Sequence, residues 1–345
     1  MLNRKWQIVT ILMGAALWAG CQSDPNIVPG KQIQFTVPQG WPQPVYKFEN
    51  NTLTTAGFEL GKKIFFDPRL SRDNTISCGS CHQPFAAFAQ LDHDFSHGVD
   101  NKLGNRNSPA LFNLNWHNGF FWDGGVNHIE NQPVNPIQNP VEMDEKLDNV
   151  IAKLKDDATY RFMFKDAFGS DTINTQKMLK ALAQFMGMLV SSNSKYDKYI
   201  RGESGGDMSS AELNGLAAYR AKCATCHTEP LFSDFSYRNN GLILSPMNDS
   251  GRGRITHAPE DMYKFKVPSL RNLKYTGPYM HDGRFRTLDE VLNHYTTSIQ
   301  PSPTLDPALQ GGVSLSAQER ADLLSFLNTL NDEEFVKDER FKEPK

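Results

Sequence analysis

Apolar residues recur at helical spacing in several stretches of this chain, and long loops containing glycine and proline separate those stretches. Between residues 54 and 66, Leu60, Ile64 and Phe65 follow a helical period. The pattern stops at Asp67-Pro68, as a helix should before a proline. Similar spacing predicts further helices over residues 146–155, 159–168 and 175–191.

Three capping boxes mark the starts of helices in the second half of the chain. Each places a glutamate three residues after a serine or threonine, so that the two side chains bind the free backbone N–H groups of the first turn. They are Ser209-x-x-Glu212, Thr287-x-x-Glu290 and Ser316-x-x-Glu319. Strand patterns are few and short. The sequence therefore predicts a mainly α protein with long functional loops between the helices.

Length and composition indicate two domains and exclude several protein classes. The chain has 345 residues, 22% of them charged and 39% apolar, which is the composition of an ordinary globular protein rather than of a coiled coil, a collagen or a disordered chain. Its net charge of −3 argues against a nucleic-acid binder. The glycine-rich segment 201–207 is the best linker. We therefore expect one domain over residues 51–203 and a second over residues 204–345.

The amino terminus has the features of an export signal. Arg4 and Lys5 precede an apolar run over residues 8–19, which is too short to span a bilayer but suits the core of a signal peptide. The run ends before Cys21 in a sequence that resembles a bacterial lipobox. We expect a signal peptide over residues 1–20, a proline-rich tether over residues 21–50, and a protein of the periplasm or cell envelope that is lipid-anchored through Cys21. The alternative is an ordinary cleaved signal with a chance cysteine.

The other four cysteines form two copies of one motif. Each copy has the pattern Cys-x-x-Cys-His, in which two cysteines can attach a haem to one short turn and the following histidine can bind its iron. The residues are Cys78, Cys81 and His82 in the first copy, and Cys223, Cys226 and His227 in the second. The pattern predicts a c-type cytochrome with two covalently bound haems, one in each domain.

Three other interpretations of the cysteine pairs are weaker. Pairs in a four-cysteine zinc site usually lie some 15–20 residues apart, much closer than these two. A thioredoxin-like motif needs a βαβ context that the sequence does not show. Two short disulfides would suit an exported protein but leave the paired histidines unexplained.

Longer motifs around the haem signatures resemble the bacterial dihaem cytochrome c peroxidase/MauG family, in the family's order and over roughly residues 54–335. In the first half these are Gly104-Asn-Arg-Asn107-Ser-Pro109, Phe121-Trp122-Asp123-Gly124, Glu130-Asn-Gln132 and Pro136-Ile-Gln-Asn-Pro140-Val-Glu142-Met143. In the second half they are Phe265-Lys-Val-Pro-Ser-Leu-Arg-Asn272 and Thr276-Gly-Pro278-Tyr-Met-His281-Asp-Gly283.

The resemblance implies roles for individual residues. The haem on His82 would be the peroxidatic one, and Glu142 matches the glutamate that moves a proton between the peroxide oxygens. Gln132 matches a second residue of that pocket, and Trp122 matches the tryptophan that conducts electrons between the haems. A solvated glutamate at a helix start and a core aromatic are the structural alternatives for Glu142 and Trp122.

The resemblance also implies a calcium ion at the domain junction. Asn107, Thr276 and Pro278 match its ligands, two of them through backbone carbonyl oxygens, which suit calcium.

The distal iron ligands depart from the peroxidase pattern. The loop that supplies a histidine to the first haem contains His93 and His97, of which His97 is better placed, although either could be a surface residue over an open pocket. At the second haem, the peroxidases use a methionine about fourteen residues after the His-Asp-Gly motif. This chain has Tyr295 at that position, and MauG-type enzymes also use a tyrosine there. A phenolate oxygen favours ferric iron, whereas a thioether raises the potential. Met280 and His294 are nearby alternatives, and a buried structural tyrosine is another.

These features predict a peroxidase that reduces hydrogen peroxide with electrons from a small donor protein, a cytochrome c or a cupredoxin. A MauG-like oxidase that acts on aromatic residues of a partner protein is the second interpretation, and Tyr295 favours it. A non-enzymatic electron-transfer cytochrome is the third, and Glu142 argues against it. We expect no nucleic-acid partner and contact with the membrane only through the lipid anchor, and the sequence leaves a monomer or a homodimer open.

Overall fold

The three predicted capping boxes begin three helices in the computed structural model, which describes residues 30–245 and 247–344. The helices are α8 (Ser210–Lys222), α10 (Leu288–Thr297) and α11 (Ala317–Asn328). At α8, for example, the Ser209 backbone N–H donates to Glu212 Oε2 at 2.6 Å, while Glu212 N–H donates to Ser209 Oγ at 3.3 Å. Glutamate near a helix start also interacts favourably with the helix dipole.

The helices predicted in the first half are present, with one difference in length. They are α1 (Thr55–Phe65), α4 (Leu147–Lys155), α5 (Ala158–Phe168) and α6 (Thr175–Gly187). The predicted extension of α6 to residue 191 is wrong. Asn113 binds the backbone of Ser191 on both sides, donating to its carbonyl at 3.1 Å and accepting from its N–H at 2.9 Å, and so holds this segment outside the helix. The shorter helices are α2 (Cys78–Cys81), α3 (Val134–Gln138), α7 (Lys195–Arg201), α9 (Gly253–Thr256) and α12 (Glu333–Lys337).

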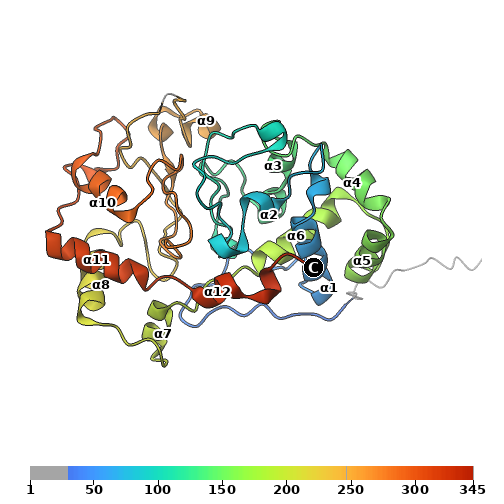
Figure 1. Cartoon of the computed structure of the whole chain (residues 1–345), viewed down its shortest axis with the longest axis horizontal. Helices are drawn as coiled ribbons and strands as arrows, with labels where there is room; N and C mark the ends of the chain where they lie inside the picture. Colours follow the sequence, from blue (N-terminus) through green and yellow to red (C-terminus); the bar gives the residue numbers. More distant parts are fainter. Residues whose placement is uncertain (1–29, 246, 345) are drawn as a thin grey trace, which may run out of the picture.

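A pair of closely packed helices supports each half of the molecule. Helices α1 and α6 pack together in the first half, and α8 and α11 in the second (Figure 1). Glycine makes both approaches possible: a Cβ on Gly61 would overlap the carbonyl oxygen of Ala181, and one on Gly215 would overlap that of Asp322. The hydrophobic residues gather in a large cluster in the first half and a smaller one in the second. This arrangement holds the two Cys-x-x-Cys-His segments in different parts of the molecule.

The two halves exchange segments at their borders. The chain's last helix, α12, returns to the first half, where Phe335 and Phe341 pack around Phe88 (Figure 1). Tyr196, on α7 before the predicted linker, packs instead with Phe232 in the second cluster. The predicted domain boundary at residues 203/204 stays a prediction.

The part of the predicted tether that the structure describes is extended and lies against the body. Trp41 packs on Trp116 with ring centroids 4.9 Å apart, and Trp116 Nε1 donates to Pro42 O at 2.8 Å. Leu231, from the second half, belongs to the same cluster. The predicted signal peptide and Cys21 lie outside the described residues. Within residues 30–245 and 247–344, none of the helices has the length and apolar character needed to cross a bilayer.

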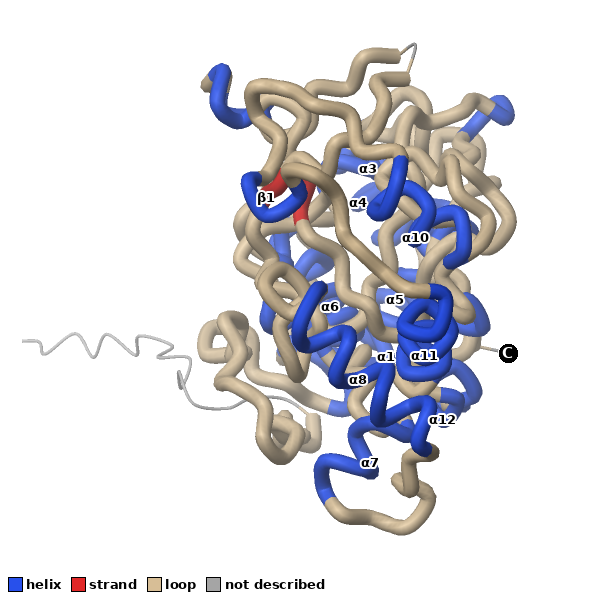
Figure 2. Tube along the Cα trace, turned by 90° about the vertical axis from the view of Figure 1, so that its left-hand side faces the viewer, coloured by secondary structure: helices blue, strands red, loops and turns tan. Residues whose placement is uncertain are grey.

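Strands are rare in the described part of the chain, as the sequence predicts. The strands β1 (Tyr237–Arg238) and β2 (Phe265–Lys266) pair antiparallel, with Tyr237 opposite Lys266 (Figure 2). The Lys266 backbone N–H also donates to Trp122 O at 2.7 Å. This short ribbon therefore ties the second half to the Trp122 loop of the first.

Candidate functional site

The first Cys-x-x-Cys-His motif forms a short turn that presents a neutral imidazole. Helix α2 begins at a capping box between Ser77 and Ser80, and His82 N–H donates to Cys78 O at 2.9 Å. The Nδ1 of His82 lies 2.9 Å from Phe88 O. A carbonyl can only accept, so Nδ1 carries the proton and Nε2 keeps its lone pair. Burial lowers the pKa of His82 to about 4, which keeps the ring neutral and able to bind a metal at pH 7.

The second motif repeats this geometry at the end of α8. His227 Nδ1 lies 3.2 Å from Phe232 O and 3.1 Å from Pro268 O, so its Nε2 is also the free ring nitrogen. Burial lowers the pKa of His227. Hydrogen bonds of this kind fix the tautomer and the orientation of a histidine that binds a metal. Both histidines are therefore prepared to bind iron through Nε2.

The cysteines of both motifs are free, partly buried thiols. Burial raises the pKa of Cys78 to about 12 and that of Cys223 to about 11. The four cysteines that the structure describes form no disulfide, and no group of three or more His, Cys, Asp or Glu side chains in the described ranges is placed to hold a metal ion. Neither the disulfide nor the zinc interpretation therefore has a counterpart in the described residues.

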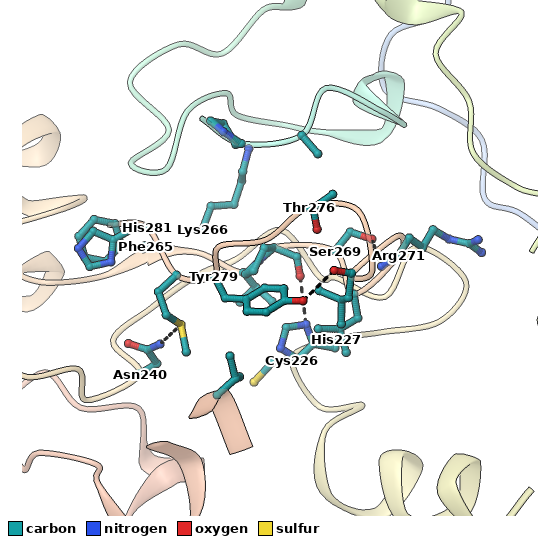
Figure 3. Close-up of a pocket in the computed structure, with 18 of the residues that line it drawn as sticks. Cys226, His227, Asn240, Phe265, Lys266, Ser269, Arg271, Thr276, Tyr279 and His281 are labelled. Atoms are coloured by element: carbon teal, nitrogen blue, oxygen red, sulfur yellow. Dashed lines mark hydrogen bonds between the residues drawn. The ribbon is translucent and has the colours of Figure 1, made fainter. Parts of the chain in front are cut away.

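A cavity of about 300 Å³ lies between the two halves and reaches the second motif. Cys223 lines it together with Cys226 and His227, the two residues of the motif that Figure 3 labels. Trp122 and Gln132 line it from the first half. The wall is mainly apolar, and none of its described residues is an aspartate or glutamate. Free thiols, a neutral imidazole and an apolar cavity fit a covalently attached haem, whose ring is apolar and whose iron needs a nitrogen ligand.

Of the three residues predicted as possible distal ligands of the second haem iron, two line the cavity and one does not. Tyr295 and Met280 line the cavity together with Cys223 and Cys226. Burial raises the pKa of Tyr295. His294 Nε2 instead lies 2.9 Å from Asn240 O, and His294 does not line the cavity. The structure thus brings Tyr295 and Met280, but not His294, to the cavity that contains the second motif.

Glu142 lies near the first motif in a partly buried position. Burial raises its pKa, and Asn139 Nδ2 donates to its Oε1 at 2.9 Å. Burial and the nearby Glu142 carboxylate together raise the pKa of the Cys81 thiol to about 11. Gly98 packs against the backbone of Glu142, where a Cβ would overlap the carbonyl oxygen. A carboxyl group with a raised pKa close to a haem-binding motif is suited to proton transfer.

The histidine loop also lies near this motif. His97 O accepts a weak hydrogen bond from Cys81 Sγ at 3.8 Å, while the His97 ring lies 4.8 Å from that of His93. His97 Nδ1 lies 3.1 Å from Asn101 Oδ1. The loop therefore reaches the first site through its backbone, and iron binding by His97 stays a prediction.

The three predicted calcium ligands line the same cavity wall. The backbone of Asn107 connects several parts of the site: its N–H donates to His281 O at 2.8 Å, and its carbonyl accepts from Trp122 Nε1 at 2.8 Å. Thr276 and Pro278 come from the second half. The predicted set is thus gathered at the junction of the halves, although calcium binding stays a prediction.

Several charged residues at this junction were not predicted from the sequence. Arg106 bridges the halves, with Nη1 2.6 Å from Asp123 Oδ2 and Nε 2.6 Å from Asp249 Oδ2. Lys266 and Arg271 both line the cavity and belong to the motif over residues 265–272; Arg271 is fully buried and Lys266 is partly buried. A lysine or arginine in a sequence usually indicates a solvated surface, so only the motif could have drawn attention to them.

Comparison with known proteins agrees with this geometry. A family model for di-haem cytochrome c peroxidase matches residues 55–205. The methylamine utilization protein MauG of Methylorubrum extorquens is 36% identical over 338 residues, which cover 94% of this chain and 91% of that protein. The cytochrome c551 peroxidase of Nitrosomonas europaea is 34% identical over 248 residues, 68% of this chain and 71% of that protein.

Solved structures lead to the same family. The crystal structure of a MauG-like protein associated with microbial copper homeostasis is 31% identical, with a TM-score of 0.84 over 90% of this chain and 99% of that one. The chain therefore belongs to the dihaem cytochrome c peroxidase/MauG family.

Proposed function

We propose that this protein is a dihaem peroxidase that reduces hydrogen peroxide to water with electrons from a small redox protein outside the cytoplasm. The observation that carries the proposal is the partly buried Glu142, with its raised pKa, beside the first Cys-x-x-Cys-His motif. A protein that only carries electrons does not need a proton-transfer group at that position. Relatives named cytochrome c peroxidase support the same conclusion.

Residues around the first motif supply the chemistry of peroxide reduction. Cys78 and Cys81 would hold the haem, and His82 would bind its iron through Nε2. The haem would supply the iron at which the O–O bond breaks. Glu142 accepts the proton of one peroxide oxygen and returns a proton to the other, which leaves as water. Two electrons and two protons per peroxide complete the reduction to two waters. The family resemblance would also assign Gln132 to positioning the peroxide, although the cavity that Gln132 lines reaches the second motif.

The second motif would receive the electrons. Cys223, Cys226 and His227, which line the cavity, would hold this haem, and Trp122 lines the same cavity from the first half. The hydrogen bond from Trp122 Nε1 to Asn107 O fixes the indole ring at the junction. We propose that Trp122 conducts electrons toward the first haem. The donor would be a cytochrome c or a cupredoxin.

The direct test is rapid mixing of the holoprotein with hydrogen peroxide and a reduced donor protein. Fast donor oxidation, with two donor molecules consumed per peroxide, is the expected result. A protein with both haems attached that fails to react with peroxide would be an electron carrier, and the proposal would be wrong.

A second candidate is a MauG-like oxidase acting on aromatic residues of a partner protein. Tyr295 on the cavity wall favours it, because tyrosine oxygen stabilises ferric iron. The same mixing experiment separates the two functions. Slow donor oxidation, together with a long-lived change in the haem spectrum after peroxide addition, would favour the oxidase.

Tyr295 is our proposed distal ligand of the second haem, and its replacement by phenylalanine tests this. We expect Tyr295→Phe to change the absorption spectrum of the haem attached at Cys223 and Cys226, because the variant lacks the coordinating oxygen. Tyr279→Phe is the matched control, since Tyr279 lines the same cavity but donates its hydroxyl to Leu273 O at 2.8 Å. An unchanged spectrum in Tyr295→Phe would show that Tyr295 is a structural residue.

We also propose that Asn107, Thr276 and Pro278 bind one calcium ion. Removing calcium with a chelator should lower peroxide turnover at least several-fold, because the ion would hold the Trp122 loop against the second half. Calcium should restore the rate, whereas magnesium should not, since magnesium demands near-ideal octahedral geometry. Full turnover in protein shown by elemental analysis to be free of calcium would contradict the proposal.

A further inference from the structure

Lys266 places an ammonium group at the cavity between the two halves. It lies on β2, and its side chain extends toward the first half (Figure 3), where it contacts the loop that carries His117 and Gly119. Its Nζ donates to Gly119 O at 2.8 Å and lies 3.2 Å from His117 Nδ1. An ammonium has three N–H donors, so these two contacts leave one donor for another acceptor.

Lys266 differs from the other cations of the cavity in having no acidic partner in the part of the chain that the structure describes. Four lysine or arginine side chains in the described residues line the wall, and three of them form ion pairs with carboxylates outside the cavity lining. The paired ones are Lys222 with Glu319 at 2.7 Å, Arg238 with Asp234 at 2.8 Å and Arg271 with Asp197 at 2.7 Å. No described carboxylate lies within 4.0 Å of Lys266 Nζ, and none lines the cavity.

The surroundings do not compensate the charge of this lysine. Burial keeps the pKa of His117 well below its usual value, so the ring is neutral and its Nδ1 accepts a hydrogen bond from the Lys266 ammonium without supplying a compensating charge. Burial also lowers the pKa of Lys266 to about 7, although Asp123 opposes this. An isolated ammonium in an apolar setting is costly unless an anion accompanies it. The site therefore favours an acidic group that enters the cavity.

The position of Lys266 relates it to the second haem. His227 Nδ1 donates a hydrogen bond to Pro268 O at 3.1 Å, and Pro268 lies two residues after Lys266 in the sequence. Lys266 also lines the same cavity as Cys223, Cys226 and His227. A haem attached at Cys223 and Cys226 with its iron on His227 would thus lie along the segment that carries Lys266. Each haem c has two propionate carboxylates, which are negatively charged at pH 7.

We propose that Lys266 binds a propionate carboxylate of the haem attached at Cys223 and Cys226. The ammonium supplies its third donor, and Gly119 O and His117 hold it in place. A charge-assisted hydrogen bond of this kind is stronger than one between neutral groups. This inference rests on the proposed haem attachment but not on peroxide turnover. It makes Lys266 a positioning residue that also raises the reduction potential of that haem.

The potentials of the two haems, measured by spectroelectrochemical titration of the holoprotein, test this inference. Lys266→Met removes a positive charge that stabilises the extra electron of the reduced haem. We expect the reduction equilibrium of the second haem to shift at least tenfold toward the oxidised form, which is 59 mV for one electron. Lys266→Arg should restore most of the potential because it retains the charge. Lys274→Met, at a side chain 58% exposed, should change neither haem.

The variants separate the inference from the alternatives. Unchanged potentials in Lys266→Met, or a shift confined to the haem at Cys78 and Cys81, would overturn it. A shift that Lys266→Arg fails to reverse would indicate a packing role and would also overturn it. If Lys266→Met does not accumulate, Lys266→Gln removes the same charge and can still donate to Gly119 O. Mass analysis that finds no haem on Cys223 and Cys226 would refute the proposed attachment itself, independently of any result with peroxide.

Discussion

Replacing Glu142 with glutamine is expected to lower the rate of peroxide reduction by about 10²–10⁴-fold, the usual contribution of a positioned general acid–base group. Glutamine has nearly the same shape and can still contact Asn139, which now donates to Glu142 Oε1 at 2.9 Å, but it cannot take up and return a proton. Stopped-flow measurement of peroxide-dependent donor oxidation, at equal haem content, gives the rate.

The pH dependence of this rate provides a second check on Glu142. Because burial raises the pKa of Glu142, this side chain should become protonated at a higher pH than an ordinary glutamate. Once protonated, it can no longer accept the first proton from peroxide. The wild-type rate should therefore fall as the pH drops through this raised pKa, and the glutamine variant should lack that limb. Glu59→Gln, at an exposed position of α1, is the control. Unaffected turnover in Glu142→Gln would remove Glu142 from the mechanism.

Replacing Arg271 with methionine is expected to lower the free energy of unfolding by about 3–5 kcal/mol, the cost of breaking one side of a buried ion pair. The Arg271 side chain is 0% exposed, and it binds Asp197 through two hydrogen bonds of 2.7 and 2.8 Å. It also donates to Pro230 O, and its guanidinium lies 4.8 Å from the Trp41 ring. The substitution leaves the Asp197 charge buried without its partner. Chemical denaturation followed by far-UV circular dichroism measures the loss.

Acidification tests whether the unpaired carboxylate causes this loss. In the wild type, burial raises the pKa of Asp197, but the hydrogen bonds from Arg271 outweigh it and lower the pKa. This contribution to stability is present above the unfolded pKa of about 3.9 and is lost as the pH falls through the lower folded pKa. In the variant the pKa should rise, so protonation relieves the buried charge and the stability difference from wild type should shrink toward pH 4.

A surface pair provides the control for Arg271. Lys337 lies 3.1 Å from Glu333, and its side chain is 72% exposed. Lys337→Met should change the free energy of unfolding by less than about 1 kcal/mol, because water screens exposed charges. If Arg271→Met lowers the free energy of unfolding by as little as Lys337→Met does, the buried pair contributes little to stability.

Patterns that depend on neighbouring residues were predicted well from the sequence. A capping box needs only a serine or threonine and a glutamate three residues later, and the three predicted boxes start α8, α10 and α11. The attachment motif likewise needs only one turn, in which Cys78 O accepts from His82 N–H. Family membership followed from longer runs of the same kind, and the relatives confirm it. The end of α6 was missed because Asn113, far away in the sequence, binds the backbone of Ser191.

Contacts between distant segments are what the folded chain adds to these patterns. The sequence contains Lys266, Arg271 and Asp197, but nothing near them indicates that Arg271 and Asp197 form a buried pair while Lys266 has no acidic partner among the described residues. Packing of the two halves around one cavity establishes this, because burial removes the water that would otherwise solvate each charge. Local hydrogen bonding and covalent spacing determine the helix starts and the haem motifs. The electrostatics of the junction arise only when both halves exclude water from the same space.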